Sequence, residues 1–250
     1  MKYIKENKLA HRTIEILITV GEELYCNGAN AFDYSKVSAR EAYVLDLSGA
    51  IGTVAYAAPT LVSFEAVVGG KVAHAGFHPE DGINSILVAA KAIAVLPQGY
   101  LDENTTANIG VIAGGSGTNI VSESYNVSGE IRSLNHEKAL QVLAHYHETF
   151  QKEAENAGVF LEWNETVNIQ AYETRLDSEV AKRYVKAIEM QRLVPVFEKT
   201  FGGSDNNVFA QHGIEGLVIA TSMNQVHSRR EYTNLSEIGQ VVQILVELGQ

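Results

Sequence analysis

The sequence predicts an α/β fold of two units, one inserted into the other. Strand and helix signals alternate along residues 1–60, and the same alternation returns from about residue 175, which indicates one α/β unit made of residues 1–60 and 173–250. Between these parts, the apolar patterns of residues 61–172 follow the order strand, helix, strand, strand, helix, strand. That order is typical of the split βαβ arrangement, an antiparallel sheet with two helices on one face.

The first unit opens with an apolar run at residues 14–20, which reads as a buried strand and is followed by Gly21, Glu22 and Glu23. A second strand is expected to end on Asp46. The remaining patterns of this unit predict a short helix near Ala29, strands at residues 42–45, 51–58 and 217–220, and helices at residues 177–191 and 235–248, with Leu235, Ile238, Val241, Val242, Leu245 and Leu248 inward.

The inserted unit is predicted from longer patterns. Apolar residues recur at spacings of three and four in two segments, as on one face of a helix, and the other segments read as extended chain. These patterns predict strands at residues 62–68, 105–113, 124–134 and 159–167, and helices at residues 83–94 and 140–157.

Composition excludes several classes of protein. A net charge of -11 over 250 residues argues against a nucleic-acid or anionic-membrane surface, since both need clustered lysine and arginine. The single cysteine, Cys26, cannot form an internal disulfide and fits a reducing compartment, so a cytoplasmic location is expected. No apolar run reaches the roughly 18 residues of a membrane helix, and the first residues lack a signal-peptide pattern.

Four polar residues are expected at the carboxyl ends of strands of the first unit, which are Glu22, Glu23, Asp46 and His227. Ligands of an open parallel sheet bind beyond those ends, so the four side chains are expected to share one crevice. Oxygen and nitrogen donors without thiolates are the set that hydrolytic zinc sites use. The sequence therefore favours a metal site.

Each of these residues also has a simpler interpretation. Adjacent glutamates suit the first turn of a helix, Asp46 suits a helix cap or a turn, and a lone His227 suits the surface. Other enzyme motifs are absent: Gly114-Gly115-Ser116-Gly117-Thr118 lacks the last glycine of a nucleophile elbow, and no phosphate-binding loop or Gly-x-Gly-x-x-Gly occurs.

Motifs along nearly the whole chain resemble those of the peptidase T and carboxypeptidase G family of two-zinc hydrolases. Within that family, the chain resembles the peptidase T-like aminopeptidases most. The motifs are Thr19-Val20-Gly21-Glu22-Glu23, Val44-Leu45-Asp46, Gly70-Lys71-Val72-Ala73-His74-Ala75-Gly76, Pro79-Glu80-Asp81-Gly82-Ile83-Asn84, Gly203-Ser204-Asp205, and Val226-His227-Ser228 with Glu231-Tyr232. The resemblance implies a zinc-aminopeptidase-like α/β catalytic domain with a ferredoxin-like α+β lid and dimerisation domain inserted at residues 61–172.

The resemblance also implies roles for the acidic residues. Glu22 matches the general base that takes a proton from the metal-bound water, while Glu23 and Asp46 match ligands of the two zinc ions. His227 matches the last ligand, on the same metal as Glu23. Zinc lowers the pKa of bound water to about 7, so a neighbouring carboxylate can act as base at neutral pH. Gly203-Ser204-Asp205 is expected to shape the pocket wall.

In the lid, the resemblance assigns three residues. His74 matches a histidine that reaches the oxyanion of the tetrahedral intermediate, often from the partner subunit, although a turn histidine beside Gly76 is an equal alternative. Asn119 and Arg132 match positions that hold the substrate's carboxylate or carbonyl. Asn119 also suits a turn, and Arg132 also suits a solvated strand edge.

One departure from the family is important. The family carries a His-x-Asp segment and a bridging aspartate before the Gly-Glu-Glu motif, whereas His11 here is followed by Arg12 and Thr13. We therefore expect the chain to lack the N-terminal part of the catalytic domain. Three hypotheses follow: part of a zinc peptidase for short peptides, most simply an aminopeptidase acting on tripeptides; an N-acyl-amino-acid deacylase; or a non-catalytic relic that binds peptides and dimerises through the lid. A homodimer through the lid domain is expected.

Overall fold

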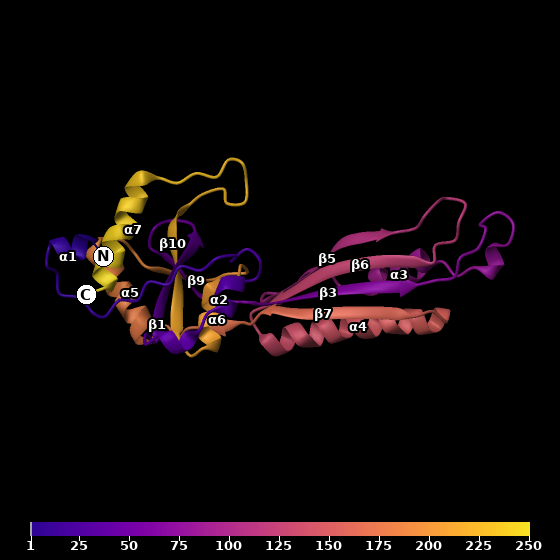
Figure 1. Cartoon of the computed structure of the whole chain (residues 1–250), viewed down its shortest axis with the longest axis horizontal. Helices are drawn as coiled ribbons and strands as arrows, with labels where there is room; N and C mark the ends of the chain where they lie inside the picture. The colour runs from indigo at the N-terminus through magenta and orange to yellow at the C-terminus, as the bar shows by residue number, and fades with distance from the viewer. Residues whose placement is uncertain (1) are drawn as a thin grey trace. The chain divides into compact units, whose positions relative to one another are not determined.

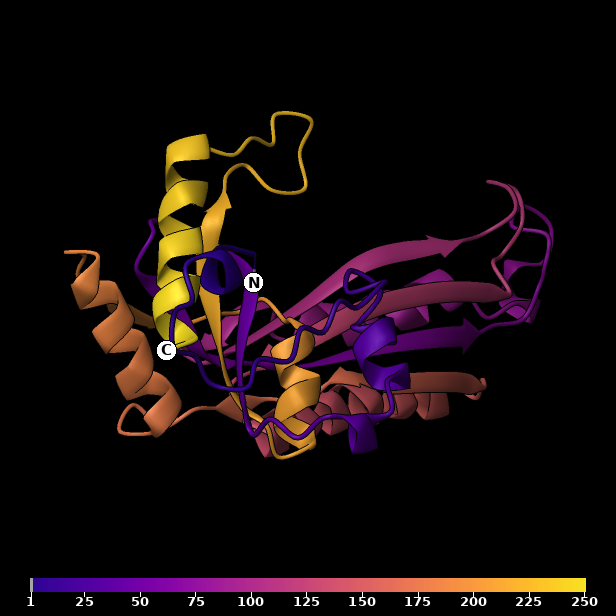
Figure 2. The ribbon, with the colours of Figure 1, turned by 60° about the vertical axis from the view of Figure 1, so that its left-hand side comes forward.

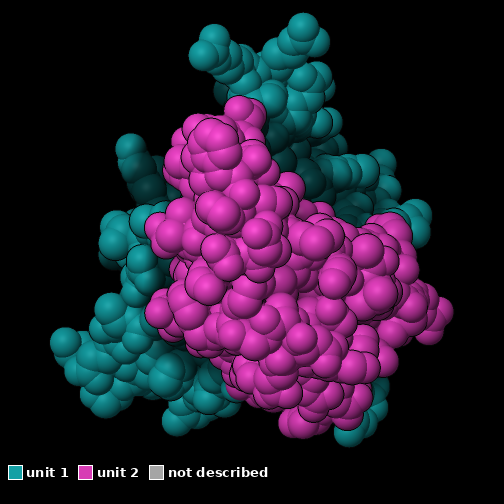
Figure 3. Space-filling model, turned by 90° about the vertical axis from the view of Figure 1, so that its right-hand side faces the viewer, with its two compact units in different colours: residues 1–58, 172–250 teal, residues 59–171 magenta. Residues whose placement is uncertain are grey.

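The computed structural model describes residues 2–250 and divides them into two compact units (Figure 1). Unit 1 contains residues up to 58 and residues 172–250, and unit 2 contains residues 59–171 (Figure 3). Each unit has its own sheet and its own apolar core. Among residues 2–250, none of the helices combines the length and the apolar character that crossing a membrane requires.

The sheet of unit 1 is mixed rather than wholly parallel. Its strands are β1 (Glu41–Ser48), β2 (Thr53–Ala58), β8 (Tyr172–Glu173), β9 (Val196–Lys199) and β10 (Glu215–Met223). They follow the order β1-β10-β2-β8, with β9 also pairing with β2. β1 runs parallel to β10, so the carboxyl ends of these two strands lie at the same edge. β10 and β2 run antiparallel.

Helices cover both faces of β10. The helices of unit 1 are α1 (Lys2–Glu6), α2 (Asn27–Ala31), α5 (Glu179–Met190), α6 (Asp205–Gln211) and α7 (Leu235–Leu248), with a 3-10 turn at Tyr34–Lys36. Leu217 and Ile219 of β10 pack with α5 and α7. The intervening Val218 and Ala220 pack on the opposite face, where α6 contributes Ala210. Figure 2 shows α7 lying beside β10.

The inward face of α7 begins later than predicted. Leu235 is 83% exposed, and Ile238 and Val242 are also exposed. The core contacts come from Ile244, Leu245 and Leu248. Val241 is buried as predicted, but Leu235 and Ile238 do not pack into the core, because the buried face of the helix starts at Val241.

The strand predicted at residues 14–20 is wrong. Residues 9–19 have no regular secondary structure, and Ile16, Ile18 and Val20 are 68%, 87% and 76% exposed. An apolar alternation becomes a strand only where another strand exchanges backbone hydrogen bonds with it. No strand among residues 2–250 pairs with this segment, and β1 pairs with β10 alone.

Unit 2 is an antiparallel sheet with two helices on one face, as predicted. Its strands are β3 (Thr60–Gly69), β4 (Gly99–Asp102), β5 (Thr105–Gly114), β6 (Ser124–Ser133) and β7 (Leu161–Ile169), in the order β4-β5-β6-β3-β7. The helices are α3 (Ser85–Val95) and α4 (His136–Ala157), with a 3-10 turn at Pro79–Asp81. The short edge strand β4 is an addition to the predicted order.

Helix α4 and strand β3 build most of the core of unit 2. The Asn135 side chain caps the start of α4, and Gly158 ends the helix with a φ of 68°. The buried face includes Leu143, Tyr146 and Phe150. The ring of Phe64 on β3 stacks on Trp163 and meets Tyr146 edge-on, with centroid distances of 4.9 and 5.6 Å.

Candidate active site

Glu22 and Glu23 lie in a tight turn that leads into α2. The backbone N–H of Cys26 donates to the carbonyl of Glu22 at 2.8 Å, and that of Gly28 donates to the carbonyl of Val20 at 2.9 Å. A Cβ at Gly28 would lie 2.4 Å from the Val20 oxygen, so only glycine permits this close approach. The two glutamates therefore precede the helix and are not part of its first turn.

Cys26 closes this turn with a buried thiol. Its side chain is 2% exposed, and its Sγ lies 4.0 Å from Glu22 Oε1. Burial and the neighbouring carboxylates of Asp205 and Glu22 raise the pKa of the thiol. The cysteine is therefore held neutral against the candidate base.

Asp46 and His227 reach the same edge of the sheet from parallel neighbours. Asp46 lies within β1 near its carboxyl end, and His227 lies in the loop after β10, with a φ of 60°. His227 Nε2 lies 3.6 Å from Glu23 Oε1, although both side chains are largely exposed. This contact joins the loop after β10 to the turn before α2.

The carboxylates of this region act on one another electrostatically. Burial, followed by the charges of Asp46, Glu23 and Asp205, raises the pKa of Glu22 to about 7. Burial, followed by Glu23 and Asp205, raises the pKa of Asp46 to about 6. His227 lowers both values. A bound cation would favour the charged forms of these acids.

These shifts predict that the metal-free protein is less stable at pH 8 than at pH 5. The folded chain retains protons on Glu22 up to about pH 7 and on Asp46 up to about pH 6, whereas the ordinary values are 4.5 and 3.8. The protons bound in the folded protein stabilise it. This stabilisation is complete at a pH below the ordinary pKa values and is lost as the pH rises through the pKa values of the folded protein. We expect a loss of roughly 1–2 kcal/mol for the pair, because solvent screens the partly exposed groups. Urea unfolding in EDTA at pH 5 and at pH 8 measures this loss of stability.

The matched control is the double variant Glu22→Gln/Asp46→Asn, which keeps the side-chain shapes and removes both titrations. Its stability should change less between pH 5 and pH 8 than that of the wild type. A wild-type protein that is more stable at pH 8 would contradict the coupling of these carboxylates.

Asp205 is the site residue whose importance the sequence does not reveal. It is 7% exposed, at the start of α6, and accepts a hydrogen bond from the hydroxyl of Thr19. Its other oxygen, Oδ1, is also buried. The sequence predicted that this segment shapes the pocket wall, and in the structure Ser204 is the residue that caps α6. Burial of a carboxylate is a tertiary property, so no local pattern marks it.

The donor chemistry of this region fits a divalent metal. Glu23 and Asp46 offer oxygen, His227 offers nitrogen, and the mutual repulsion of the carboxylates is the condition that a cation relieves. Among residues 2–250, however, no three histidine, cysteine, aspartate or glutamate side chains converge into a ready cluster. Glu23 and His227 are therefore in contact, and Asp46 is near enough for their charges to act on it, but the three donors do not form a coordination shell.

His74 and Asn119 lie side by side in unit 2. The backbone N–H of Ala75 donates to the carbonyl of Asn119 at 3.0 Å, and His74 forms an isolated bridge with Ile120. The Nδ1 of His74 accepts the N–H of Gly76 at 3.1 Å, so the histidine supports the turn as the simpler interpretation proposed. That hydrogen bond uses Nδ1 and not Nε2.

Arg132 is separated from this pair within unit 2. It lies near the end of β6, whereas the segment before Ser124 bridges to His74, and eight strand residues span roughly 26 Å. Its guanidinium also donates to both carboxylate oxygens of Glu130, at 2.8 and 3.4 Å. The structure therefore does not gather Arg132 with His74 and Asn119.

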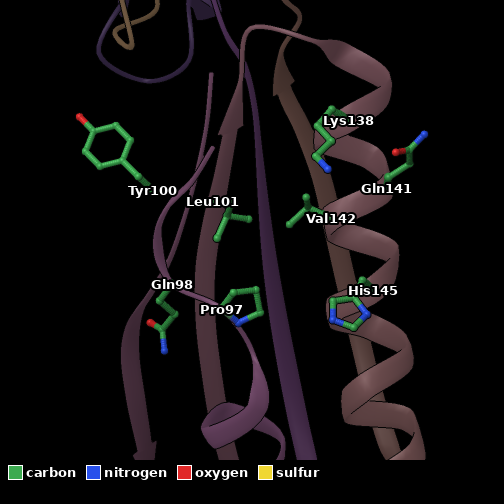
Figure 4. Close-up of a pocket in the computed structure, with 8 residues that line it drawn as sticks. All are labelled: Pro97, Gln98, Tyr100, Leu101, Lys138, Gln141, Val142 and His145. Carbon is green, nitrogen blue, oxygen red and sulfur yellow. The ribbon is translucent and has the colours of Figure 1, made fainter. Parts of the chain in front are cut away.

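A hollow in unit 2 involves none of these residues. Figure 4 shows it between α4, which contributes Val142 and His145, and the segment around β4, which contributes Pro97 and Leu101. The residues predicted for catalysis or substrate binding lie elsewhere in the two units.

Comparison with known proteins places this geometry in a family. The model of the M20 peptidase dimerisation domain matches residues 56–158. The uncharacterized protein YqjE of Bacillus subtilis is 36% identical over 248 residues, which are 99% of this chain and 67% of that protein. The aminopeptidase PepT of Bacillus cereus is 36% identical, with a TM-score of 0.94 over 99% of this chain and 66% of that structure. The chain belongs to the M20 peptidase family.

Two further solved structures extend the comparison. A tripeptidase of Staphylococcus aureus is 30% identical, with a TM-score of 0.96 over 99% of this chain and 66% of that structure. A Bacillus subtilis protein described as a dinuclear metal-binding peptidase of the M20 family is 19% identical, with a TM-score of 0.71 over 92% of this chain and 62% of that structure, and it supports the fold alone. The chain spans about two thirds of the length of these M20 relatives.

Proposed function

We propose that this M20 chain forms most of the catalytic centre of a zinc-dependent aminopeptidase that releases N-terminal residues from short peptides, most simply tripeptides. The observation that carries the proposal is the meeting of the Glu22-Glu23 turn with His227 at the carboxyl edge of β1 and β10, where Asp46 also lies. The similarity to an aminopeptidase and a tripeptidase supports this choice of substrate.

Glu23, Asp46 and His227 are the residues that would hold metal. A bound zinc would supply Lewis-acid chemistry, which lowers the pKa of water and polarises a carbonyl. Glu22 serves as general base, because its carboxylate lies close to these donors and can accept a proton and return it to the departing amine. Asp205 holds Thr19 and thereby fixes the start of the turn that carries Glu22.

Unit 2 is proposed to contact the substrate and to form a homodimer, as the match to a dimerisation domain supports. His74 and Asn119 are the proposed contacts for the carbonyl of the reacting bond, since they already adjoin each other. Arg132 would have to break its ion pair with Glu130 before it bound a carboxylate of the substrate. The buried, unpaired Cys26 supports a cytoplasmic location.

The test is product release from matched substrates by the purified protein after addition of Zn²⁺. We expect free N-terminal residues from tripeptides, little product from the same tripeptides after N-acetylation, and no activity after chelation. Hydrolysis of N-acetyl amino acids without hydrolysis of tripeptides would replace the proposal by a deacylase. Absence of metal-dependent hydrolysis for all substrates would contradict catalysis by this chain alone, and zinc content would then separate an incomplete peptidase from a non-catalytic relic.

A further inference from the structure

Two reciprocal backbone hydrogen bonds join the two sides of the loop that carries His227 at its base. In residues 224–234, the N–H of Asn224 donates to the carbonyl of Tyr232 at 3.1 Å, and the N–H of Tyr232 donates to the carbonyl of Asn224 at 3.1 Å. Figure 2 shows this loop as a long excursion between β10 and α7. Its tip, with Arg229 and Arg230, is exposed.

Beneath this base lies Ser222, which is 0% exposed and has a φ of 65°. A residue with a Cβ is strained in this conformation, and glycine would adopt it at less cost. The serine offers what glycine lacks, because its hydroxyl donates to Glu237 Oε2 at 2.6 Å and accepts the N–H of Asn234 at 3.0 Å. Its carbonyl also accepts the side-chain amide of Asn224 at 3.1 Å.

These bonds connect the end of β10 to the start of α7, which the loop separates in sequence. Ser222 belongs to the end of β10, Asn234 is the residue that caps α7, and Glu237 lies in the first turn of that helix. One buried hydroxyl thus holds the two ends of the loop together. A strained residue persists only where its surroundings hold it, which is frequent in segments that position functional groups.

We propose that Ser222 and Glu237 form a latch that fixes the loop of residues 224–234 and so positions His227. Ser222 is a positioning residue and touches neither metal nor substrate. The importance of the latch for catalysis rests on the proposed function of His227 as a metal ligand. The effect of the latch on the loop does not rest on that function, because the hydrogen bonds are present without a metal.

Limited proteolysis of the full chain with trypsin, in EDTA, tests the latch. Trypsin cleaves after arginine, and Arg229 and Arg230 lie in the latched loop, whereas the exposed Arg175 lies outside it. Cleavage follows the population of opened loop when opening is fast. We expect Ser222→Ala to accelerate cleavage at Arg229 and Arg230 about tenfold, with no change at Arg175. Mass spectrometry of the fragments measures each rate.

Three further variants separate the hydroxyl from other effects. Glu237→Gln retains a side-chain oxygen that accepts the hydroxyl and should behave like the wild type, whereas Glu237→Ala should behave like Ser222→Ala. Ser236→Ala removes a neighbouring hydroxyl that donates to the side chain of Asn234 and does not contact Ser222 or Glu237 in the described chain, and it should leave the rates unchanged. Circular dichroism of each variant verifies that the fold is retained.

Two results would overturn the latch. The first is equal cleavage of Ser222→Ala and the wild type at Arg229 and Arg230. The second is a Ser222→Gly variant that is cleaved as slowly as the wild type, because the position would then need only a positive φ. A separate titration with Zn²⁺ addresses the proposed function: failure of Zn²⁺ to protect the wild-type loop would contradict the ligand role of His227, while the difference measured in EDTA would still support the latch.

Discussion

Glu22→Gln is expected to lower kcat by about 10²–10⁴-fold while the protein retains its affinity for Zn²⁺. The amide has the shape of the carboxylate but cannot accept the proton that general-base catalysis removes. Glu22 lies close enough to Asp46 and Glu23 for their charges to raise its pKa in the metal-free protein, so its carboxylate is placed beside the proposed metal ligands. The measurement is the rate of tripeptide hydrolysis at saturating Zn²⁺, together with Zn²⁺ affinity by calorimetry.

Glu23→Gln is the matched comparison, because it makes the same chemical change one residue away. Glu23 contacts His227, so its variant should lose Zn²⁺ affinity as well as turnover. Wild-type kcat in Glu22→Gln would remove this residue as the base. Equal losses of Zn²⁺ affinity in the two variants would instead make Glu22 a ligand.

Phe64→Ala is expected to destabilise unit 2 by about 3–5 kcal/mol. Phe64 is 1% exposed, and its ring fills the space between Trp163 and Tyr146. Truncation leaves a cavity that the stacked rings cannot close without losing their contacts. Since whole domains have stabilities of about 5–15 kcal/mol, the variant should lose much of its margin against unfolding. Urea unfolding followed by tryptophan fluorescence measures the change.

The fluorescence is specific to this unit, because Trp163 is the single tryptophan of the chain and stacks directly on Phe64. Phe77→Ala is the control, since Phe77 is 76% exposed and lies outside the core of unit 2. Its free energy of unfolding should change by less than about 0.5 kcal/mol. Equal shifts in both variants would contradict the role of Phe64 in the core.

The sequence predicted unit 2 well because its elements are long and locally determined. The pattern at residues 140–157 identified α4, whose start at His136 depends on the Asn135 cap. In unit 1, short strands such as β8 and β9 were missed because they exist through their pairing with β2. The failed strand at residues 14–20 has the same cause: periodicity describes one segment and does not specify a partner.

The candidate site was predicted in its residues but not in its interactions. The parallel pairing of β1 and β10 explains why Asp46 and His227 reach one edge, as expected from strand ends. The burial of Asp205 and its bond to Thr19 join residues that are 186 positions apart, which no spacing rule anticipates. The Arg132–Glu130 pair was accessible from sequence, because alternate residues of a strand share a face.

The buried thiol of Cys26 gives the protein a native chemical reporter. A thiol-alkylating reagent needs both access and a thiolate, and the folded turn denies it both. Because no other cysteine is present, every alkylated molecule records one opening of the turn that carries Glu22. The rate of alkylation therefore reports how often the thiol beside the candidate base becomes exposed, in the unmodified chain and without a substrate.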